Sequence, residues 1–488
     1  MTKLTLFFST LSLIFLFAAC KSNSKESLET AFGSFLASTE NVAVFGSVDA
    51  SAILDKSDIK NFPKVGVIVK SVSTKVFGAF DEKSPIYMAT VAKDSEQAMY
   101  FFLKVKNRDS VSALFREYGY LVENGGDFDY MEEEYVTVGF NDHQAVLIVR
   151  NKKIDAKALL TTTFGSIAAG KTPTAKVAEL IKEKGDIVFN TALGYGTFFG
   201  ENGLTEATEG MKKLQEIAKD SYYSSAINFE NGKMTLNITG FLTDALKERI
   251  PLKSTEINNL SAKMGTGNAR FGFSINADVD KFQSWMTDFF PEGKANTLDE
   301  WMDGIGMFIP GVDGSKYSNI LAGDIAVLLC LEGESYSGGI PQINASVGFG
   351  SQGDKVAEAA ASRAVLIGAS KIGENTYSYE GGTYTLTSKG VNGQTAAASG
   401  KLKMPNGSEK FGASPLTAFL NLEGVNIASF GFEDAAKVIE IVRYVKMDAS
   451  AEKGKIEVVV KDPNQNILKQ ALLYFKNEIV NEVDKVGL

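Results

Sequence analysis

The sequence predicts an α+β fold in two similar tandem halves, each a mixed, mainly antiparallel sheet with helices packed on one face. Three observations lead to this prediction. The chain has 488 residues, 44% of them apolar, whereas single hydrophobic cores stop growing near about 250 to 300 residues. Strand-length apolar runs joined by polar turns alternate with amphipathic helical patterns. Finally, the same order of elements occurs twice along the chain.

Residues 1–19 are predicted to form a signal peptide. A short basic start at Met1–Lys3 precedes an apolar stretch that ends at Phe17, and this stretch is shorter than the about 20 apolar residues of a permanent membrane span. The motif Leu16-Phe-Ala-Ala-Cys20 that closes it resembles the lipobox of bacterial lipoproteins, in which the chain is cut before the cysteine. We therefore expect acyl chains on Cys20 that anchor the protein in a membrane. The alternative is an ordinary signal peptide with a chance cysteine.

Residues 20–39 are predicted to be a lipidated tether. After Cys20, the run Lys21–Ser27 is polar and has no apolar periodicity, as is typical of flexible segments. Lys21, rather than an aspartate, follows the cysteine, and by resemblance to better-known envelope lipoproteins this favours the outer membrane. Whether the protein faces the periplasm or the exterior stays open.

The composition excludes several classes of function. The net charge is −9 at pH 7, whereas a protein that binds a phosphate backbone needs a basic face. The chain has two cysteines and one histidine, too few for zinc sites built from several of these ligands. Because Cys20 is assigned to the lipid, we predict no disulfide. From the composition and the charge we also predict no catalytic residue, no metal site, no cofactor and no nucleic-acid partner. A hydrolase that uses two carboxylates stays open, since such residues can lie far apart along the chain.

The second cysteine and the histidine are predicted to have no chemical role. Cys330 ends the apolar run DIAVLLC, which is typical of a buried strand and predicts an inert thiol. His143 lies in Asn141-Asp-His-Gln144, a turn composition that predicts an exposed side chain. Two acidic segments, 127–134 and 462–466, lack the glycine at the sixth position of a calcium loop. Both are predicted to be solvated turns.

A glycine pattern in the second half raises the question of a nucleotide site. Gly348, Gly350 and Gly353 form G-x-G-x-x-G between an apolar run and a helical pattern, which is the fingerprint of a dinucleotide-binding turn. The same joint between strand and helix occurs at 103–115 and 273–285 without three glycines. Hairpins surround the segment, where the nucleotide fold needs parallel strands. We therefore predict a plain loop and no bound nucleotide.

Four pairs of segments carry the internal repeat. They are residues 44–54 with 270–282, 86–119 with 324–363, 130–151 with 377–400, and 211–249 with 436–475. A tandem duplication is the simplest account, with a first half at 40–250, a linker at 251–267 and a second half at 268–488. Chance similarity of two α+β segments is the alternative.

The last pair of segments is predicted to contain a helix, a hairpin and a final helix. The i, i+3, i+4, i+7 spacing of a helix with one buried face is shown by Val438, Ile441, Val442 and Val445. Asn231-Gly232 predicts a two-residue hairpin turn in which both residues have positive φ. Lys453-Gly454 is predicted to occupy the equivalent place in the second half.

Three segments resemble a family of Bacteroidetes outer-membrane lipoproteins that is defined only as a domain of unknown function. They are ENVAVFGSVDASAILDKSDIK at 40–60, INFENGKMTL at 227–236 and LAGDIAVLLCLEG at 321–333. The resemblance covers most of the chain from about Glu40 onward. It implies an outer-membrane location and brings no catalytic or binding residue with it.

The sequence therefore favours a lipid-anchored envelope protein without catalytic activity, which acts as a macromolecular binding or scaffold component and has an envelope protein as partner. The alternative is a glycan- or peptide-binding lipoprotein with its ligand between the two halves. In that case Trp285 and Trp301 would provide an aromatic platform for the ligand. Against this, Phe282, Trp285 and Phe289 have helical spacing, which favours packing of Trp285 in the core.

Overall fold

The computed structural model describes most of the first half of the chain and parts of the second. The described ranges are 27–62, 64–93, 96–152, 155–194, 209–253, 267–289, 324–332, 342–349, short pieces between 358 and 423, and 440–475. The chain divides into two compact units. The first takes its described residues from 27–194, 219–241 and 462–475, and the second from 209–218 and 242–461.

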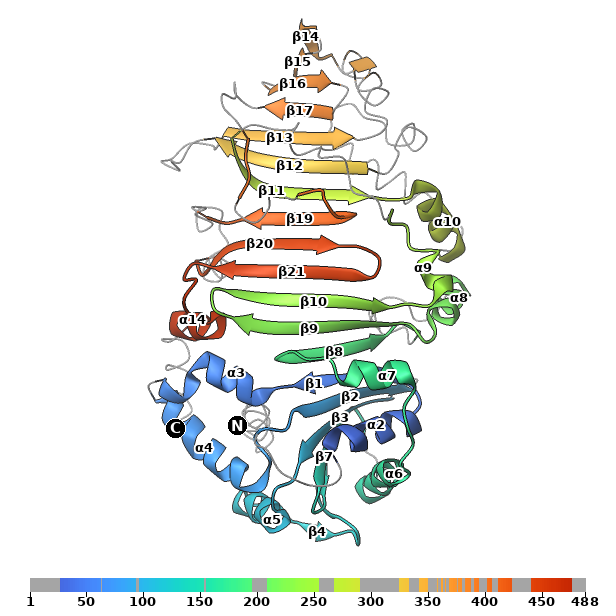
Figure 1. Cartoon of the computed structure of the whole chain (residues 1–488), viewed down its shortest axis with the longest axis vertical. Helices are drawn as coiled ribbons and strands as arrows, with labels where there is room; N and C mark the ends of the chain where they lie inside the picture. The colour runs from blue at the N-terminus through green and yellow to red at the C-terminus, as the bar shows by residue number, and fades with distance from the viewer. Residues whose placement is uncertain are drawn as a thin grey trace. The chain divides into compact units, whose positions relative to one another are not determined.

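The first unit contains an antiparallel sheet (Figure 1). Its strands, in order of pairing, are β4 (Glu123–Asn124), β5 (Asp129–Glu133), β6 (Val136–Phe140), β7 (Gln144–Arg150), β3 (Glu96–Lys104), β2 (Ile86–Lys93), β1 (Val42–Val48), β8 (Ile187–Ala192), β9 (Tyr222–Glu230) and β10 (Lys233–Phe241). Each of these pairings is antiparallel, as predicted.

Six of the described helices of this unit begin at a polar side chain that caps them. They are α2 (Leu28–Ser38), α3 (Ala50–Ser57), α4 (Val65–Ala79), α5 (Arg108–Glu117), α6 (Ala156–Ala168), α7 (Ala175–Ile181) and α14 (Ile467–Tyr474), with the short 3-10 helix η1 (Ile59–Asn61). Side-chain oxygens accept a hydrogen bond from the first turn of the helix at Ser27, Asp49, Asn107, Asp155, Thr174 and Asn466. Such caps satisfy backbone N–H groups that have no partner within the helix.

Helices cover both faces of the first sheet, which corrects the prediction of helices on one face only. Alternate residues of β7 point to different cores: Leu147 packs with α4 and α5, and Ile148 packs with α2, α6 and α7. Figure 1 shows these two groups of helices on opposite sides of the strands. The physical reason is that β6 and β7 are apolar on both faces, so each face has to be covered.

The predicted tether at 20–39 is, in its described part, mainly a packed helix. Within α2, Phe32 and Phe35 are 0% and 2% exposed, and their rings lie 5.2 and 4.9 Å from that of Phe102. Replacing a buried phenylalanine by alanine costs about 3–5 kcal/mol, so α2 is an integral part of the core. Residues 20–26 lie outside the described ranges.

The second unit repeats the sheet order of the first. Its strands are β14 (Ser370–Gly373), β15 (Thr376–Tyr379), β16 (Gly382–Thr387), β17 (Gly390–Gln394), β13 (Gln342–Phe349), β12 (Asp324–Glu332), β11 (Gly267–Asn276), β19 (Leu416–Asn421), β20 (Val442–Ala449) and β21 (Lys453–Val460), all antiparallel. The short β18 (Leu402–Lys403) pairs in parallel with β11. The described helices of this unit include α8 (Glu209–Ala218), α9 (Asp244–Lys247) and α10 (Val279–Phe289).

One pair of residues recurs at the same register in both sheets. Gly46 of β1 lies opposite Phe189 of β8, and Gly272 of β11 lies opposite Phe419 of β19. A Cβ on Gly272 would lie 2.3 Å from the ring of Phe419, so a side chain does not fit there. The register agrees with the sequence match of 44–54 with 270–282. The shared order is consistent with a tandem duplication, which stays a prediction.

The compact units differ from the predicted halves by two exchanged segments. α14, the final helix of the predicted second half, belongs to the first unit, where it packs against α3 and Lys469 Nζ lies 2.7 Å from Asp58 Oδ2. α8 and α9, from the predicted first half, belong to the second unit, where α8 packs against α10. The cut predicted at 251–267 therefore does not separate the compact units, and 254–266 lie outside the described ranges.

The turns of the two long hairpins differ in detail from the prediction. β9 and β10 are joined by Asn231 and Gly232, as predicted, but of the two only Gly232 has a positive φ, +73°. A turn of this kind needs a left-handed backbone at only one of its two central residues. Lys453 and Gly454 lie in β21 rather than in a turn, and the chain reverses at residues 450–452.

Two further local predictions are wrong. Val442 and Val445, predicted in a helix, lie in β20, because β-branched residues also suit a strand and the sheet supplies partners on both sides. Residues 129–133, predicted within a solvated turn, form β5 with Tyr130 and Met131 buried. The adjacent Tyr130 and Met131 pack in different cores, because successive residues of a strand point to opposite faces of the sheet. The segment at 462–466 is a turn, as predicted.

The exchange of α14 depends on a close contact at Gly232. Its N–H donates to the carbonyl of Gln465, and a Cβ at this position would lie 2.7 Å from Cα of Pro463. We expect Gly232→Ala to lower the free energy of unfolding by about 1–3 kcal/mol, from left-handed strain plus this clash. Gly119→Ala is the matched control, since Gly119 has φ +82° with open space around its position. Urea unfolding that gives equal losses for both variants would show that the contact with Pro463 is unimportant.

A buried carboxylate between two lysines in the second unit should make the stability of this unit depend on pH. Glu457 is 6% exposed, with Lys446 and Lys455 at 2.6 and 2.9 Å. Burial raises the pKa of its carboxyl, but hydrogen bonds from the two lysines outweigh burial and lower it from 4.5 to about 2. The stabilising contribution is therefore present above pH 4.5 and is lost as the pH falls towards 2.

We expect Glu457→Gln to remove this part of the pH dependence. The loss of unfolding free energy between pH 5 and 2.5 should be smaller in the variant than in the wild type, by up to about 3 kcal/mol. Urea titrations at the two pH values measure the difference. Glu452→Gln, at the exposed turn of the same hairpin, should keep the wild-type slope. An unchanged slope in Glu457→Gln would contradict the assignment.

Candidate functional site

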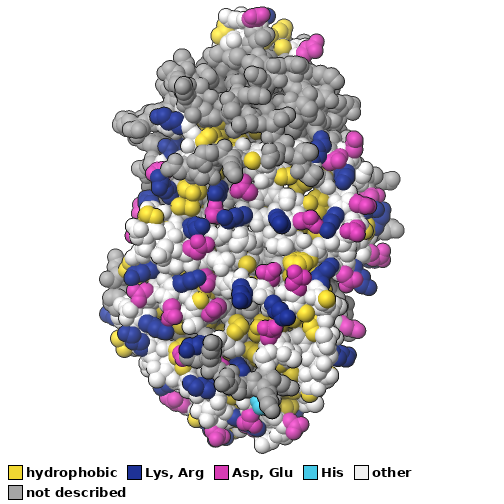
Figure 2. Space-filling model, in the orientation of Figure 1, with side chains coloured by type: hydrophobic (Ala, Val, Ile, Leu, Met, Phe, Trp, Pro, Cys, Tyr) yellow, Lys and Arg dark blue, Asp and Glu magenta, His cyan; other side chains and the backbone are white. Residues whose placement is uncertain are grey.

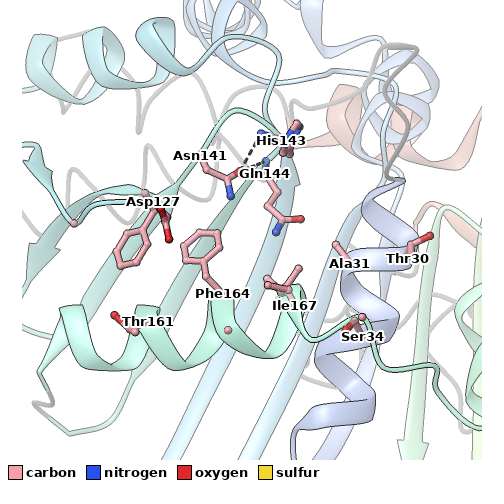
Figure 3. Close-up of a pocket in the computed structure, with 15 residues that line it drawn as sticks. Thr30, Ala31, Ser34, Asp127, Asn141, His143, Gln144, Thr161, Phe164 and Ile167 are labelled. Carbon is pink, nitrogen blue, oxygen red and sulfur yellow. Dashed lines mark hydrogen bonds between the residues drawn. The ribbon is translucent and has the colours of Figure 1, made fainter.

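The first unit contains a cavity of about 450 Å³ between its N-terminal helix, α6 and two turns of the sheet (Figure 3). α2 contributes one wall and α6 another, and the turns that join β4 to β5 and β6 to β7 complete it. The lining residues are Thr30, Ala31, Ser34, Gly125, Asp127, Phe128, Asn141, His143, Gln144, Thr161, Phe164, Gly165, Ile167, Ala168 and Gly170. This volume lies in the range of pockets that hold small ligands.

The turn from β6 to β7 is built by one side chain. Asn141 Oδ1 accepts hydrogen bonds from the backbone N–H groups of His143 and Gln144, at 2.9 and 3.0 Å. This turn exposes the imidazole of His143 at the cavity rim, which confirms that the histidine is exposed in a turn. It also directs the next side chain, that of Gln144, inwards (Figure 3).

Two stacked aromatic rings form part of the apolar wall. The centroids of Phe128 and Phe164 lie 4.9 Å apart, with the rings 19° from parallel. Gly125 allows this arrangement, because a Cβ at its position would lie 2.7 Å from the Phe128 ring. Phe128 is buried, whereas Phe164 is half-buried. Part of the Phe164 ring therefore stays accessible from the cavity.

The polar wall of the cavity contains the side-chain amide of Gln144. Gln144 is 7% exposed, and its side-chain amide forms no hydrogen bond with any residue in the described ranges. Ser34, by contrast, donates its hydroxyl to the carbonyl of Ser166 at 3.0 Å, which ties α2 to α6. The Gln144 side chain points into the cavity (Figure 3), so its amide is placed to hydrogen-bond with a molecule that enters.

The described lining of the cavity carries little charge. Its titratable residues are Asp127 and His143, both exposed at the rim, and none of the described lining residues is a lysine or arginine. The carboxyl with a raised pKa in the described ranges, Asp81, owes the shift mainly to burial and lies in the turn before β2, away from the cavity. Among the residues described, no group of three His, Cys, Asp or Glu side chains is placed to hold a metal ion.

Of the segments singled out from the sequence, the turn at Asn141–Gln144 and Asp127 of the acidic segment line this cavity. Trp285 lies half-buried in α10 of the second unit, whereas Cys20 and Trp301 lie outside the described ranges. The aromatic platform of these two tryptophans thus stays a prediction. Cys330 is 0% exposed in β12, packed with Leu328 and Ala269, so the predicted buried thiol is confirmed.

Gly348 belongs to a strand and not to a loop, which corrects that part of the glycine prediction. It lies in β13 and pairs with Ala326 of β12 and Gly390 of β17, both antiparallel. A dinucleotide-binding turn follows a strand that has a parallel neighbour, and β13 has antiparallel neighbours on both sides. Gly350 and Gly353 lie outside the described ranges.

Comparisons with known proteins add little. No family model matches the chain, and no curated protein matches it. Two solved structures with partial similarity are crystal forms III and I of TP0453, each 12% identical. Form III covers 46% of this chain and 82% of its own with a TM-score of 0.29, and form I covers 45% and 80% with a TM-score of 0.26. Similarity at this level supports no conclusion about this protein.

The unpartnered amide leads to an unusual expectation for stability. We expect Gln144→Leu to raise the free energy of unfolding of the ligand-free protein by about 1 kcal/mol, because it removes a buried polar side chain whose amide forms no hydrogen bond with the described residues. Asn141→Leu is the contrasting variant and should destabilise, since it removes both turn hydrogen bonds. Chemical denaturation measures both. A destabilised Gln144→Leu would mean that the amide is already satisfied.

Proposed function

We propose that this protein is a lipid-anchored binding or scaffold component of the outer membrane, without catalytic activity. The observation that carries the proposal is the lipobox that ends at Cys20, followed after seven residues by the buried helix α2. Eight residue steps at about 3.3–3.6 Å each span less than about 30 Å. An acylated Cys20 would therefore hold the first unit close to the bilayer surface.

The surface of the protein supports a protein partner better than a nucleic acid. Figure 2 shows basic and acidic side chains interspersed on the face in view, and a nucleic-acid partner would need a continuous basic region. Among the helices within the described ranges, none has the length and apolar content needed to cross a bilayer.

A glycan- or peptide-binding lipoprotein is the second candidate. The cavity between α2 and α6 favours it, because the cavity combines an accessible aromatic ring at Phe164 with an unpartnered amide at Gln144. Pockets that bind small ligands combine apolar walls with a few polar groups in this way. Both candidates describe an anchored protein that binds and does not catalyse.

The anchor is tested by the variant Cys20→Ala expressed in a bacterial envelope. We expect the wild type to incorporate labelled palmitate and to fractionate with the outer membrane, whereas the variant should incorporate none and become soluble, because one residue carries all the acyl chains. Cys330→Ala, which alters the only other cysteine, should keep both the label and the membrane location. Retention of Cys20→Ala in the membrane fraction would contradict the proposal.

The scaffold role is tested by chemical cross-linking of the same strains. A partner in stoichiometric amount should cross-link to the acylated protein at the outer membrane, and the yield should fall when the anchor is removed, since the anchor raises the local concentration. Cross-links to bulk envelope proteins alone would leave the cavity as the binding surface and would contradict the scaffold role.

A further inference from the structure

The described lining of the cavity is poorly suited to charged ligands. None of the described lining residues is a lysine or arginine, so a phosphate or carboxylate ligand would lose its hydration without gaining a cation from them. The carboxylate of Asp127 at the rim would also repel an anion. A cation would meet only that one exposed carboxylate. The chemistry of the walls thus favours a neutral ligand.

The cavity is also unsuited to a purely apolar ligand. An acyl chain would offer no hydrogen bond to the amide of Gln144, which forms none with the described residues, and it would cover that amide. Each polar group that is covered without a partner opposes binding. A fitting ligand has to donate or accept hydrogen bonds on one side while it presents an apolar side to Phe164.

The positions of the two key groups match a ring with one apolar face. Phe164 rises from α6 and Gln144 points in from the start of β7, so the aromatic ring and the amide approach the cavity from different walls (Figure 3). A sugar ring has C–H faces that pack on aromatic rings and hydroxyl groups around its edge that hydrogen-bond to amides. Aromatic side chains favour such face contacts, and amides can both donate and accept.

We propose that this cavity, lined by Gln144, Phe164 and Ser34, is a binding site for a neutral sugar ring, as a free saccharide or as the end of a glycan. The inference rests on the proposed binding function and deepens it. It also moves the site from the region between the two halves into the first compact unit. In this site the sugar supplies the hydrogen bonds that the Gln144 amide lacks.

Two glycines provide a test in which the variant should fold as well as the wild type. Gly165 lies on α6 and lines the cavity, and a Cβ added to it meets nothing within 4 Å. The first side-chain atom of Gly165→Leu therefore has room, the added side chain should narrow the cavity, and leucine is the better helix former. Gly78 of α4 has the same open space but lies away from the cavity. Gly78→Leu is thus the matched control.

The experiment uses the full chain with Cys20→Ala, so that sugar binding is measured independently of the anchor. An array of neutral glycans identifies the best ligand, and isothermal titration calorimetry measures its affinity, with glucuronate and decanoate as charged and apolar probes. We expect a neutral saccharide to bind, and both Gly165→Leu and Gln144→Leu to weaken it about tenfold or more. Gly78→Leu should stay within about twofold of the parent.

Three outcomes would overturn the inference. They are the absence of any bound neutral glycan, saccharide binding that Gly165→Leu leaves unchanged, and tight binding of decanoate that Gly165→Leu abolishes. The last outcome would assign the cavity to an apolar ligand. None of them bears on palmitate incorporation at Cys20, so failure of the sugar site and failure of the anchored function give different results.

Discussion

The packing of α2 on the first sheet is the interaction on which the rest of this account depends. Phe32 and Phe35 leave almost no surface to solvent, and the ring of Phe32 lies 4.9 Å from that of Tyr87. This contact closes one face of the sheet and places Thr30, Ala31 and Ser34 at the cavity. The helix begins eight residues after Cys20 in the sequence. Core and cavity therefore share one helix, and the proposed anchor at Cys20 precedes that helix in the chain.

Much of the fold could be predicted from local patterns, because those patterns act over a few residues. The Asn231-Gly232 hairpin, the buried run around Cys330 and the exposed turn at His143 each follow from neighbouring residues. The sequence of α2 also contains a helical pattern, since Leu28, Phe32 and Phe35 have helical spacing. The polar run before it nevertheless led to the prediction of a tether. In β20 a helix was predicted where the structure has a strand. Its valines fit both the helical and the strand spacing, and pairing with β19 and β21 favours the strand.

The cavity could not be predicted from one sequence. Ser34, Asp127, Gln144 and Phe164 come from distant parts of the chain, and only the pairing of β7 with β6 and the packing of α6 bring them together. The sequence also does not predict that α14 belongs to the first unit. That placement depends on the close contact between Gly232 and Pro463, which are far apart in the chain. Trp285 and Trp301 were predicted as ligand-binding residues from their residue type alone, whereas the described lining of the cavity contains phenylalanine rings and the amide of Gln144. Chemistry that needs long-range contacts leaves no local pattern.

The most direct test of the central claim is hydrogen exchange of the acylated full-length protein, followed by mass spectrometry across residues 28–38. If α2 is part of the core, the amides after its first turn should be protected to the same degree as those of β1 and β2, because they open only when the unit unfolds. Rapid exchange of α2 while β1 and β2 stay protected would show that the helix belongs to the tether. In that case the cavity would lose a wall, and the link between anchor and core would be wrong.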